Sequence, residues 1–461
     1  MRRAWMMALM AVAGCGAQDT VVEAQTTRVT VQSSGGEDGT QWINGAPVRT
    51  RVQVGANGET FVGVWIDAPD QAPAIQARAP MSLSLVVDTS GSMSGAKIQN
   101  ARMAAASLLE SLSDGDIVSI YSFSNGVMEI APPTVVDEMS RPQLMGRVNY
   151  LHAGGGTNMY AGVQTGITRA AQAPASHAVR RVVLISDGHA NIGPSDPMSL
   201  GTLAGNGTEY AVQISAIGVG LDYDENTLGA LAVQSSGRLY HLERPEQMAR
   251  ILEQEINLLA HTVATNAYIE IVPAPGVQIL EGLSQGATLE DGRLRVPVGS
   301  VFAGQRRDVL FRARVATQRP GERQLATARF VYRAAGDDAE QTQTTRLSYQ
   351  VQRNAVPADQ GVDHRVQAMV ATVEAARAQR QAAEALNRGD RAAAQQHFQF
   401  AEQQIEGALA APVPAQERRR LEQSVRRVRE VRTRAATAAT PAAARGAALE
   451  SYDAAMEAEG Y

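Results

Sequence analysis

The chain has 461 residues, long enough for about three domains, with 44% apolar residues and a formal net charge of −5. Its single cysteine excludes an intrachain disulfide, so stability has to come from the burial of apolar surface. After the N-terminus, no segment contains the roughly 18 consecutive apolar residues that a membrane-spanning helix needs.

The first fifteen residues have the pattern of an export signal. Two arginines precede a short apolar run that ends at Gly14, and this run is too short to span a bilayer stably. Residues 12–15 resemble a bacterial lipobox, which implies that Cys15 is acylated and becomes the mature N-terminus. The resemblance implies a membrane-anchored lipoprotein of the bacterial cell envelope, and Gly16 favours the outer membrane. A plain secretory signal with an incidental cysteine is the alternative.

Two strand patterns follow a polar segment. Residues 16–42 bear glycine and serine, so we expect a tether. Residues 43–80 contain two alternating runs, which are divided by the sequence Gly-Ala-Asn-Gly at residues 55–58. An Asn-Gly pair between such runs predicts a β-hairpin. These strands are too few to stand alone, and we expect them to join strands elsewhere in the chain.

Residues 81–262 alternate strand and helix patterns, which predicts a doubly wound sheet. The predicted strands cover residues 83–87, 117–123, 127–130, 182–186 and 212–219, and predicted helices include residues 159–171 and 246–259.

A loop with three oxygen-bearing side chains follows the first of these strands. Asp88, Ser90 and Ser92 occupy alternate positions, just before a predicted helix. In open α/β sheets ligands bind at the carboxyl ends of the strands. A hard cation such as Mg²⁺ prefers a shell of small oxygen ligands of this kind.

The Asp-x-Ser-x-Ser pattern resembles the metal-ion-dependent adhesion site of von Willebrand factor type A domains. That family supplies a threonine from a second loop and an aspartate from a third, and residues 154–158 and 182–188 fit these loops. The resemblance implies that serine and threonine hydroxyls bind the metal directly and that the aspartates act through water. The implied ligands of Mg²⁺, or of Mn²⁺ or Ca²⁺, are Asp88, Ser90, Ser92, Thr157 and Asp187. The alternative is that these are ordinary turns in which Ser and Asp cap helices.

Two further motifs are rejected. The aspartates from Asp222 onward suggest a calcium loop, but its sixth position is Thr227 and its twelfth is Val233, where glycine and glutamate are required. We expect Asp224 to cap the next helix instead. Residues 282–286 match the G-x-S-x-G motif of hydrolases, which requires a helix directly after the serine. A turn and a strand are predicted there, so no nucleophile is assigned.

Strand patterns return over residues 263–353, and their count and spacing predict a β-sandwich. Asp291 and Gly292 join two of its runs. We expect residues 43–80 to belong to the same sandwich, which the α/β region then interrupts.

Residues 354–461 are rich in alanine, glutamine, arginine and glutamate and predict a helical hairpin followed by a basic helix. The hairpin vaguely resembles a tetratricopeptide pair, although one pair is too few for a solenoid. The arginines of the basic helix could meet anionic lipid or another acidic surface. A solvated face with interspersed glutamates is the preferred interpretation. The whole chain is therefore predicted to be a multidomain α/β protein with a flanking β-sandwich and a C-terminal α-helical region.

The resemblance implies a metal-dependent protein-binding module, for adhesion or assembly, in which an Asp or Glu carboxylate of a partner protein occupies an open position on the metal. Hydrolysis by metal-activated water is an alternative. The nearest loops offer only His152 and His189, in no catalytic motif, so we predict no enzymatic activity. A scaffold with a purely structural metal is the third interpretation. Nothing in the sequence indicates nucleic acid or a small-molecule substrate.

Overall fold

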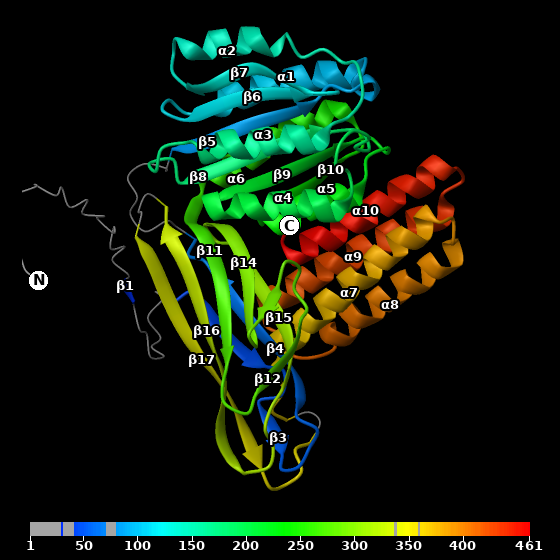
Figure 1. Cartoon of the computed structure of the whole chain (residues 1–461). Helices are drawn as coiled ribbons and strands as arrows, with labels where there is room; N and C mark the ends of the chain where they lie inside the picture. Colours follow the sequence, from blue (N-terminus) through cyan, green and yellow to red (C-terminus); the bar gives the residue numbers. More distant parts are fainter. Residues whose placement is uncertain (1–28, 31–40, 71–79, 336–338, 358–359) are drawn as a thin grey trace, which may run out of the picture.

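The computed structural model describes residues 29–30, 41–70, 80–335, 339–357 and 360–461. Cys15 and the predicted export signal lie outside the described residues. The described chain forms an α/β domain, a β-sandwich and a group of long helices (Figure 1). In this part of the chain, no helix combines the length and apolar character needed to cross a bilayer.

A six-stranded sheet is the centre of the α/β domain. Its order is β10-β9-β8-β5-β6-β7, with β7 antiparallel to its neighbour β6 and the other pairs parallel. The doubly wound prediction is therefore confirmed. The strands are β5 (Met81–Asp88), β6 (Ile117–Phe123), β7 (Val127–Val135), β8 (Val179–Ser186), β9 (Val212–Val219) and β10 (Arg238–Leu242).

Helices cover both faces of this sheet. One core contains residues of α1 (Ala96–Ser111), α2 (Ser140–Val148) and α6 (Met248–Ala260). The other contains residues of α3 (Met159–Ala171), α4 (Pro197–Gly207) and α5 (Glu225–Ser235). Along β5, Leu85 and Val87 belong to the first core and Val86 to the second. Burial on both sides explains why this strand is a continuous apolar run.

Two sheets form the β-sandwich, and one apolar core lies between them. The smaller sheet has the order β12-β15-β4-β2, and its strands are β2 (Ile43–Pro47), β4 (Glu59–Asp67), β12 (Gln278–Gly282) and β15 (Arg306–Arg314). The larger sheet contains β1 (Val29–Thr30), β3 (Arg51–Gln53), β11 (Thr262–Pro273), β13 (Thr288–Glu290), β14 (Arg293–Phe302), β16 (Gly321–Ala334) and β17 (Glu340–Gln352). The strands that precede the α/β domain thus pair with strands that follow it.

The hairpin predicted at residues 55–58 is wrong. Strand β3 pairs with β17 of the larger sheet, whereas β4 pairs with β2 and β15 of the smaller one. The connection crosses between the sheets and is bound to the segment after β15. The Val315 amide donates to the Gly58 carbonyl at 2.8 Å, and the Gly55 amide to the Thr317 carbonyl at 3.1 Å. An Asn-Gly pair reports only the local tendency to turn, and it carries no information about strand partners as distant in sequence as β15 and β17. The turn at Asp291 and Gly292, in contrast, does join the antiparallel strands β13 and β14.

The C-terminal region contains four helices rather than the predicted hairpin and one basic helix. They are α7 (His364–Asn387), α8 (Arg391–Leu409), α9 (Ala415–Thr437) and α10 (Pro441–Glu459). The prediction omitted α10, whose buried residues are mostly alanines and give no strong apolar stripe. A start signal was present, because the Thr440 side chain caps the helix and Pro441 occupies its first turn.

These helices pack on both other parts of the molecule (Figure 1). On α7, Val366 and Met369 contact Trp65 and Leu310 on the outer face of the smaller sheet. Gly63 permits this close approach, since a Cβ there would lie 2.8 Å from the Met369 sulfur. Helix α10 packs against the α/β domain and adds Leu449 and Met456 to the core beneath α3, α4 and α5.

Candidate metal centre

Asp88 is the last residue of β5 and lies at the carboxyl edge of the sheet. Its carboxylate is fully buried. The backbone amide of Ser90 donates to Asp88 Oδ1 at 2.8 Å, and the Ser186 hydroxyl donates to Asp88 Oδ2 at 2.6 Å. The carboxylate is therefore held between the first loop and the end of the neighbouring strand β8.

A chain of hydrogen bonds links three of the other predicted ligands. The hydroxyl oxygens of Ser90 and Ser92 are 3.0 Å apart, and the Ser92 hydroxyl donates to Asp187 Oδ1 at 2.8 Å. Asp187 is fully buried, whereas Ser92 is exposed. The structure thus brings the first and third loops together at one accessible place on the edge of the sheet.

Thr157 is placed by its own loop, which is bound to the first one through the backbone. The Gly91 amide donates to the Gly155 carbonyl at 3.0 Å, and the Gly154 amide to the Thr89 carbonyl at 2.7 Å. Thr157 is 3% exposed, and its hydroxyl has no hydrogen-bond partner among the described residues. A hydroxyl that protein groups leave free in an otherwise buried residue can serve as a ligand to an ion at this place.

Residues that the sequence reasoning missed support this site. Lys97 forms an ion pair with Asp187 Oδ2. A signal was available, because Lys97 lies in the first turn of α1, where the helix dipole disfavours a cation unless an acidic group is near. Asn191 accepts a hydrogen bond from the Thr157 amide at 2.8 Å, and Asn125 accepts one from the Gly156 amide at 2.6 Å. These two side chains fix the second loop.

The electrostatics of the site favour a bound cation. Burial raises the pKa of Asp88, hydrogen bonds from Ser186 and Ser90 oppose that rise, and the charge of Asp187 adds to it. Two buried carboxylates at this edge are balanced locally by the one ammonium group of Lys97. A divalent cation would lower the free energy of both ionised carboxylates.

The donor set fits a hard divalent ion. In the described part of the chain, no three His, Cys, Asp or Glu side chains gather as a metal-binding group. The candidate centre has a different composition, with two carboxylates and three hydroxyl groups. Oxygen-only sites with few carboxylates suit Mg²⁺, which keeps several water ligands.

The two histidines near the site lie on the surface. His152 is exposed and its Nδ1 is 2.9 Å from the Tyr150 carbonyl oxygen, while His189 is also exposed. Among the described residues, no carboxylate is hydrogen-bonded to either ring. A general base normally needs such a partner to fix its tautomer and raise its basicity.

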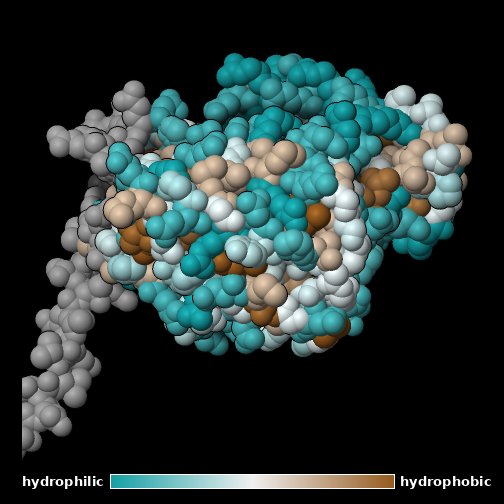
Figure 2. Space-filling view, turned by 90° about the horizontal axis from the view of Figure 1, so that it is seen from above, coloured by the Kyte–Doolittle hydropathy of each residue, from teal (hydrophilic) through white to brown (hydrophobic). Residues whose placement is uncertain are grey.

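Seen from above, the molecule is largely hydrophilic, with apolar residues in small separate patches (Figure 2).

The rejected motifs behave as predicted in two respects. Asp224 caps α5, because its side chain accepts a hydrogen bond from the Asn226 amide. Ser284 lies in the turn after β12 and is followed by β13 rather than a helix.

Comparisons with known proteins identify the family of the α/β domain. The family model for the von Willebrand factor type A domain matches residues 83–254. The uncharacterized protein sll0103 of Synechocystis sp. is 26% identical over 70% of this chain and 78% of its own length. The uncharacterized protein YfbK of Escherichia coli is 27% identical over 42% of this chain, and inter-alpha-trypsin inhibitor heavy chain H3 of Rattus norvegicus is 26% identical over 44%. The chain spans 34% and 23% of those two relatives.

Solved structures extend the likeness beyond the α/β domain. A von Willebrand factor type A protein from Catenulispora acidiphila superposes with a TM-score of 0.70 at 16% identity, covering 91% of this chain and 98% of that one. The ArnB paralog VWA2 from Sulfolobus acidocaldarius gives a TM-score of 0.58 at 16% identity, covering 90% and 98%. The likeness shows that the fold of nearly the whole chain has precedents. Residues 83–254 of this protein are a von Willebrand factor type A domain.

Proposed function

We propose that this chain is a metal-dependent protein-binding module. Domains of this type commonly mediate contacts between proteins. The observation that carries the proposal is the hydrogen-bonded series from Asp88 through Ser90 and Ser92 to Asp187 at the carboxyl edge of the sheet. Those groups lie on loops, and Ser92 reaches the surface, so a partner protein has access to them.

Five residues would hold a divalent ion, and they would do so in two different ways. Ser90, Ser92 and Thr157 provide neutral hydroxyls. Asp88 and Asp187 are engaged through both carboxylate oxygens with protein donors, which suits a role through water. When bound, the ion would supply a positive site for a carboxylate of the partner. Few anionic ligands leave that site electrophilic, so an Asp or Glu side chain is the expected partner group.

We propose no enzymatic activity. The surface positions of His152 and His189 do not favour a general base. A hydrolase would also have to bind a substrate beside the metal, and the described loops there carry mainly glycine, serine and asparagine.

The test is capture of proteins from a cell-envelope extract in Mg²⁺ and in EDTA, together with Mg²⁺ titration calorimetry. Asp88→Ala should abolish the calorimetric signal and the Mg²⁺-dependent capture. Ser94→Ala is the matched control, because Ser94 lies in the same loop but its hydroxyl bonds only the Gly91 carbonyl. Capture that is equal in Mg²⁺ and EDTA would show that the metal, if bound, is structural and that this mechanism is wrong.

We also propose that the chain is anchored to the cell envelope through an acylated Cys15. The support comes from the sequence alone, in which the single cysteine directly follows Val-Ala-Gly. Native protein should partition into a detergent phase and the Cys15→Ser form should remain in the aqueous phase, because acyl chains supply the membrane affinity. Mass spectrometry that finds an unmodified cysteine in the mature protein would refute the anchor without affecting the metal proposal.

A further inference from the structure

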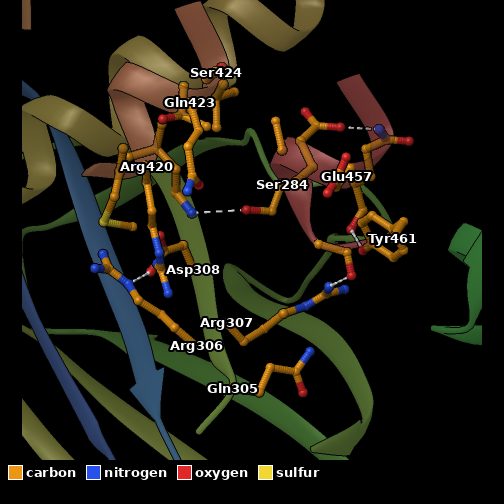
Figure 3. A pocket seen from close by; sticks show the side chains of 18 of the residues that line it. Ser284, Gln305, Arg306, Arg307, Asp308, Arg420, Gln423, Ser424, Glu457 and Tyr461 are labelled. Carbon is orange, nitrogen blue, oxygen red and sulfur yellow. Dashed lines mark hydrogen bonds and ion pairs between the residues drawn. The ribbon is translucent and has the colours of Figure 1, made fainter. Parts of the chain in front are cut away.

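Three parts of the molecule meet around a cavity of about 580 Å³ (Figure 3). The wall combines residues of β10, the β14–β15 connection, the turn after β12, helices α6, α7, α9 and α10, and the final Tyr461. None of the five proposed metal ligands lines it. Its volume is typical of small-molecule sites, which often lie between domains.

The cavity wall carries an excess of positive charge. Its five arginines are Arg238, Arg306, Arg307, Arg420 and Arg427. Every acidic side chain of the wall already has an arginine partner: Asp308 and Glu417 pair with Arg306, Glu457 with Arg427, and Glu459 with Arg380. Within the described ranges, no carboxylate forms an ion pair with Arg238, Arg307 or Arg420. Three guanidinium groups therefore lie outside the ion pairs of the wall, although the charges of Asp308 and Asp67 still act on Arg420, and the five arginines exceed the four acidic side chains by one.

Two of the arginines, Arg306 and Arg307, are buried, and each could accept a further interaction with an anion. Arg307 is 6% exposed, donates to the Gly460 carbonyl and lies 4.2 Å from the centre of the Tyr461 ring. Both partners are uncharged. The Arg306 side chain is 2% exposed and pairs with Asp308 and Glu417, but its Nη2 has no hydrogen-bond partner among the described residues. A buried guanidinium without a carboxylate, as at Arg307, or with an unsatisfied donor, as at Arg306, is costly, so a bound anion would stabilise this wall.

Neutral donors and apolar side chains complete the cavity. Arg420, Gln423 and Ser424 of α9 lie on one side of the view in Figure 3, and Gln305 and Arg307 on another. Gln305 uses its carbonyl oxygen to accept from the Phe302 amide at 3.0 Å, so its NH₂ group can serve a ligand. The larger apolar side chains of the wall include Leu258, Phe302, Leu310, Met369, Val373 and Leu421.

We propose that this cavity binds a small amphiphilic anion, with a phosphate or carboxylate group held by the unpaired arginines and an apolar portion against the aliphatic wall. Guanidinium groups match the planar oxygens of both head groups. An apolar wall alone would bind a neutral molecule equally well, and arginines alone would bind any free phosphate. The combination selects a ligand that has both parts.

The experiment is titration calorimetry of the full chain in its Cys15→Ser form, which excludes an acyl group at that residue. The probes are octyl phosphate and octanoate, with octanol and inorganic phosphate as half-ligands. At least one amphiphilic anion should bind more tightly than either half-ligand, and the two anions show which head group is preferred. Arg420→Gln should weaken that binding roughly tenfold or more, since it removes charged hydrogen bonds.

Arg419→Gln is the matched control, because Arg419 precedes Arg420 on α9 but is exposed outside the cavity. It should leave the affinity unchanged. If the Arg420 variant does not fold, Arg238→Gln makes the same test. Absence of binding by both anions, octanol binding as tightly as octyl phosphate, or equal effects of the Arg419 and Arg420 substitutions would each overturn the proposal.

Discussion

Two polar constellations lie at the carboxyl edge of the six-stranded sheet, and they are built in different ways. The metal centre uses short side chains of one domain, and Ser92 and Asp187 are 95 residues apart. The second constellation joins two domains, because Arg445 of α10 binds Glu225 at the start of α5, 220 residues earlier. The metal centre depends on the loops at the edge of one sheet, whereas the Arg445–Glu225 contact forms only when α10 packs against the α/β domain.

The interdomain constellation is the denser of the two. Arg445 donates to both carboxylate oxygens of Glu225, at 2.8 and 2.6 Å, and to the carbonyls of Leu221 and Tyr223. Burial alone would raise the pKa of Glu225, but the bonds from Arg445 lower it below the ordinary value. In the metal centre, by contrast, the hydroxyl of Thr157 has no hydrogen-bond partner within the part of the chain that the structure describes. We conclude that the interdomain constellation serves stability, whereas the metal centre is the one that we propose to serve a ligand.

The largest expected effect comes from breaking the interdomain contact. Arg445→Met should lower the free energy of unfolding by about 3–5 kcal/mol, because Glu225 stays buried without its partner. Chemical denaturation measures this change. Arg388→Met is the control, since Arg388 is an exposed arginine of the neighbouring α7–α8 turn with a weak pairing at 3.9 Å. Equal losses in the two variants would contradict the assignment.

The same variant tests whether the two constellations are separate. A Cβ on Gly220 would lie 3.8 Å from Lys97 Nζ, so the loop that Arg445 holds also passes the ion pair of Asp187. We expect Mg²⁺ affinity in Arg445→Met to change by less than about threefold, because sites without shared partners behave additively. A larger change in calorimetry would show that α10 influences the metal centre.

A smaller effect should follow pH through His241, which lies beside the interdomain contact. Burial, aided by the charge of Arg445, lowers the pKa of His241 to about 4 from 6.5. Between these values only the unfolded chain binds the proton, so stability falls as the pH falls. From pH 7 to pH 5 this group should remove about 2 kcal/mol of stability.

Asp453 titrates in the same pH range, because burial raises its pKa to about 6, and its contribution to stability falls as the pH rises. Comparing the native chain with the His241→Asn variant separates the contribution of His241, because Asp453 is present in both proteins. The variant should therefore lose about 2 kcal/mol less than the native chain between pH 7 and pH 5. Parallel pH profiles of the two proteins would show that His241 does not titrate in this range.

The smallest effect is expected on the exposed face of the basic helix α9. Arg429 pairs with Glu406 of α8, and both side chains are about half exposed. Arg429→Gln should change the free energy of unfolding by less than about 1 kcal/mol. Sedimentation with anionic phosphatidylglycerol vesicles, using the Cys15→Ser background, should give no binding that depends on Arg429. Vesicle binding lost with this substitution would favour the lipid interpretation instead.

The metal edge could be located from the sequence because local rules place its residues. A strand buried on both faces is a continuous apolar run, and the loop after it must lie at the carboxyl edge. The resemblance to von Willebrand factor type A domains then implied Thr157 and Asp187 as the further ligands beside Asp88. The sequence did not show that Lys97 faces Asp187 or that Asn125 fixes the second loop, because both contacts depend on how loops fold against one another.

The interdomain contacts were beyond local reasoning. Helix α10 buries mainly alanines, such as Ala447 and Ala448, so it lacks the large apolar residues that make a stripe visible. Arg445 looks like any surface arginine until Glu225 is placed beside it. The hairpin at residues 55–58 was predicted wrongly for the same reason, since β3 pairs with β17 and β4 with β15, two strands that lie after the α/β domain.

The interrupted sandwich sets an order of events during synthesis. Glu59 of β4 pairs with Arg314 of β15, 255 residues later. While the ribosome adds the intervening segment, β2 and β4 have no β15 beside them, and the six-stranded sheet can form before the sandwich. Until β15 emerges, the apolar faces of Val62 and Val64 and the open side of β4 are exposed to other nascent chains. A chaperone over residues 43–67 would protect this step, because long-range pairing of this kind is intrinsically slow.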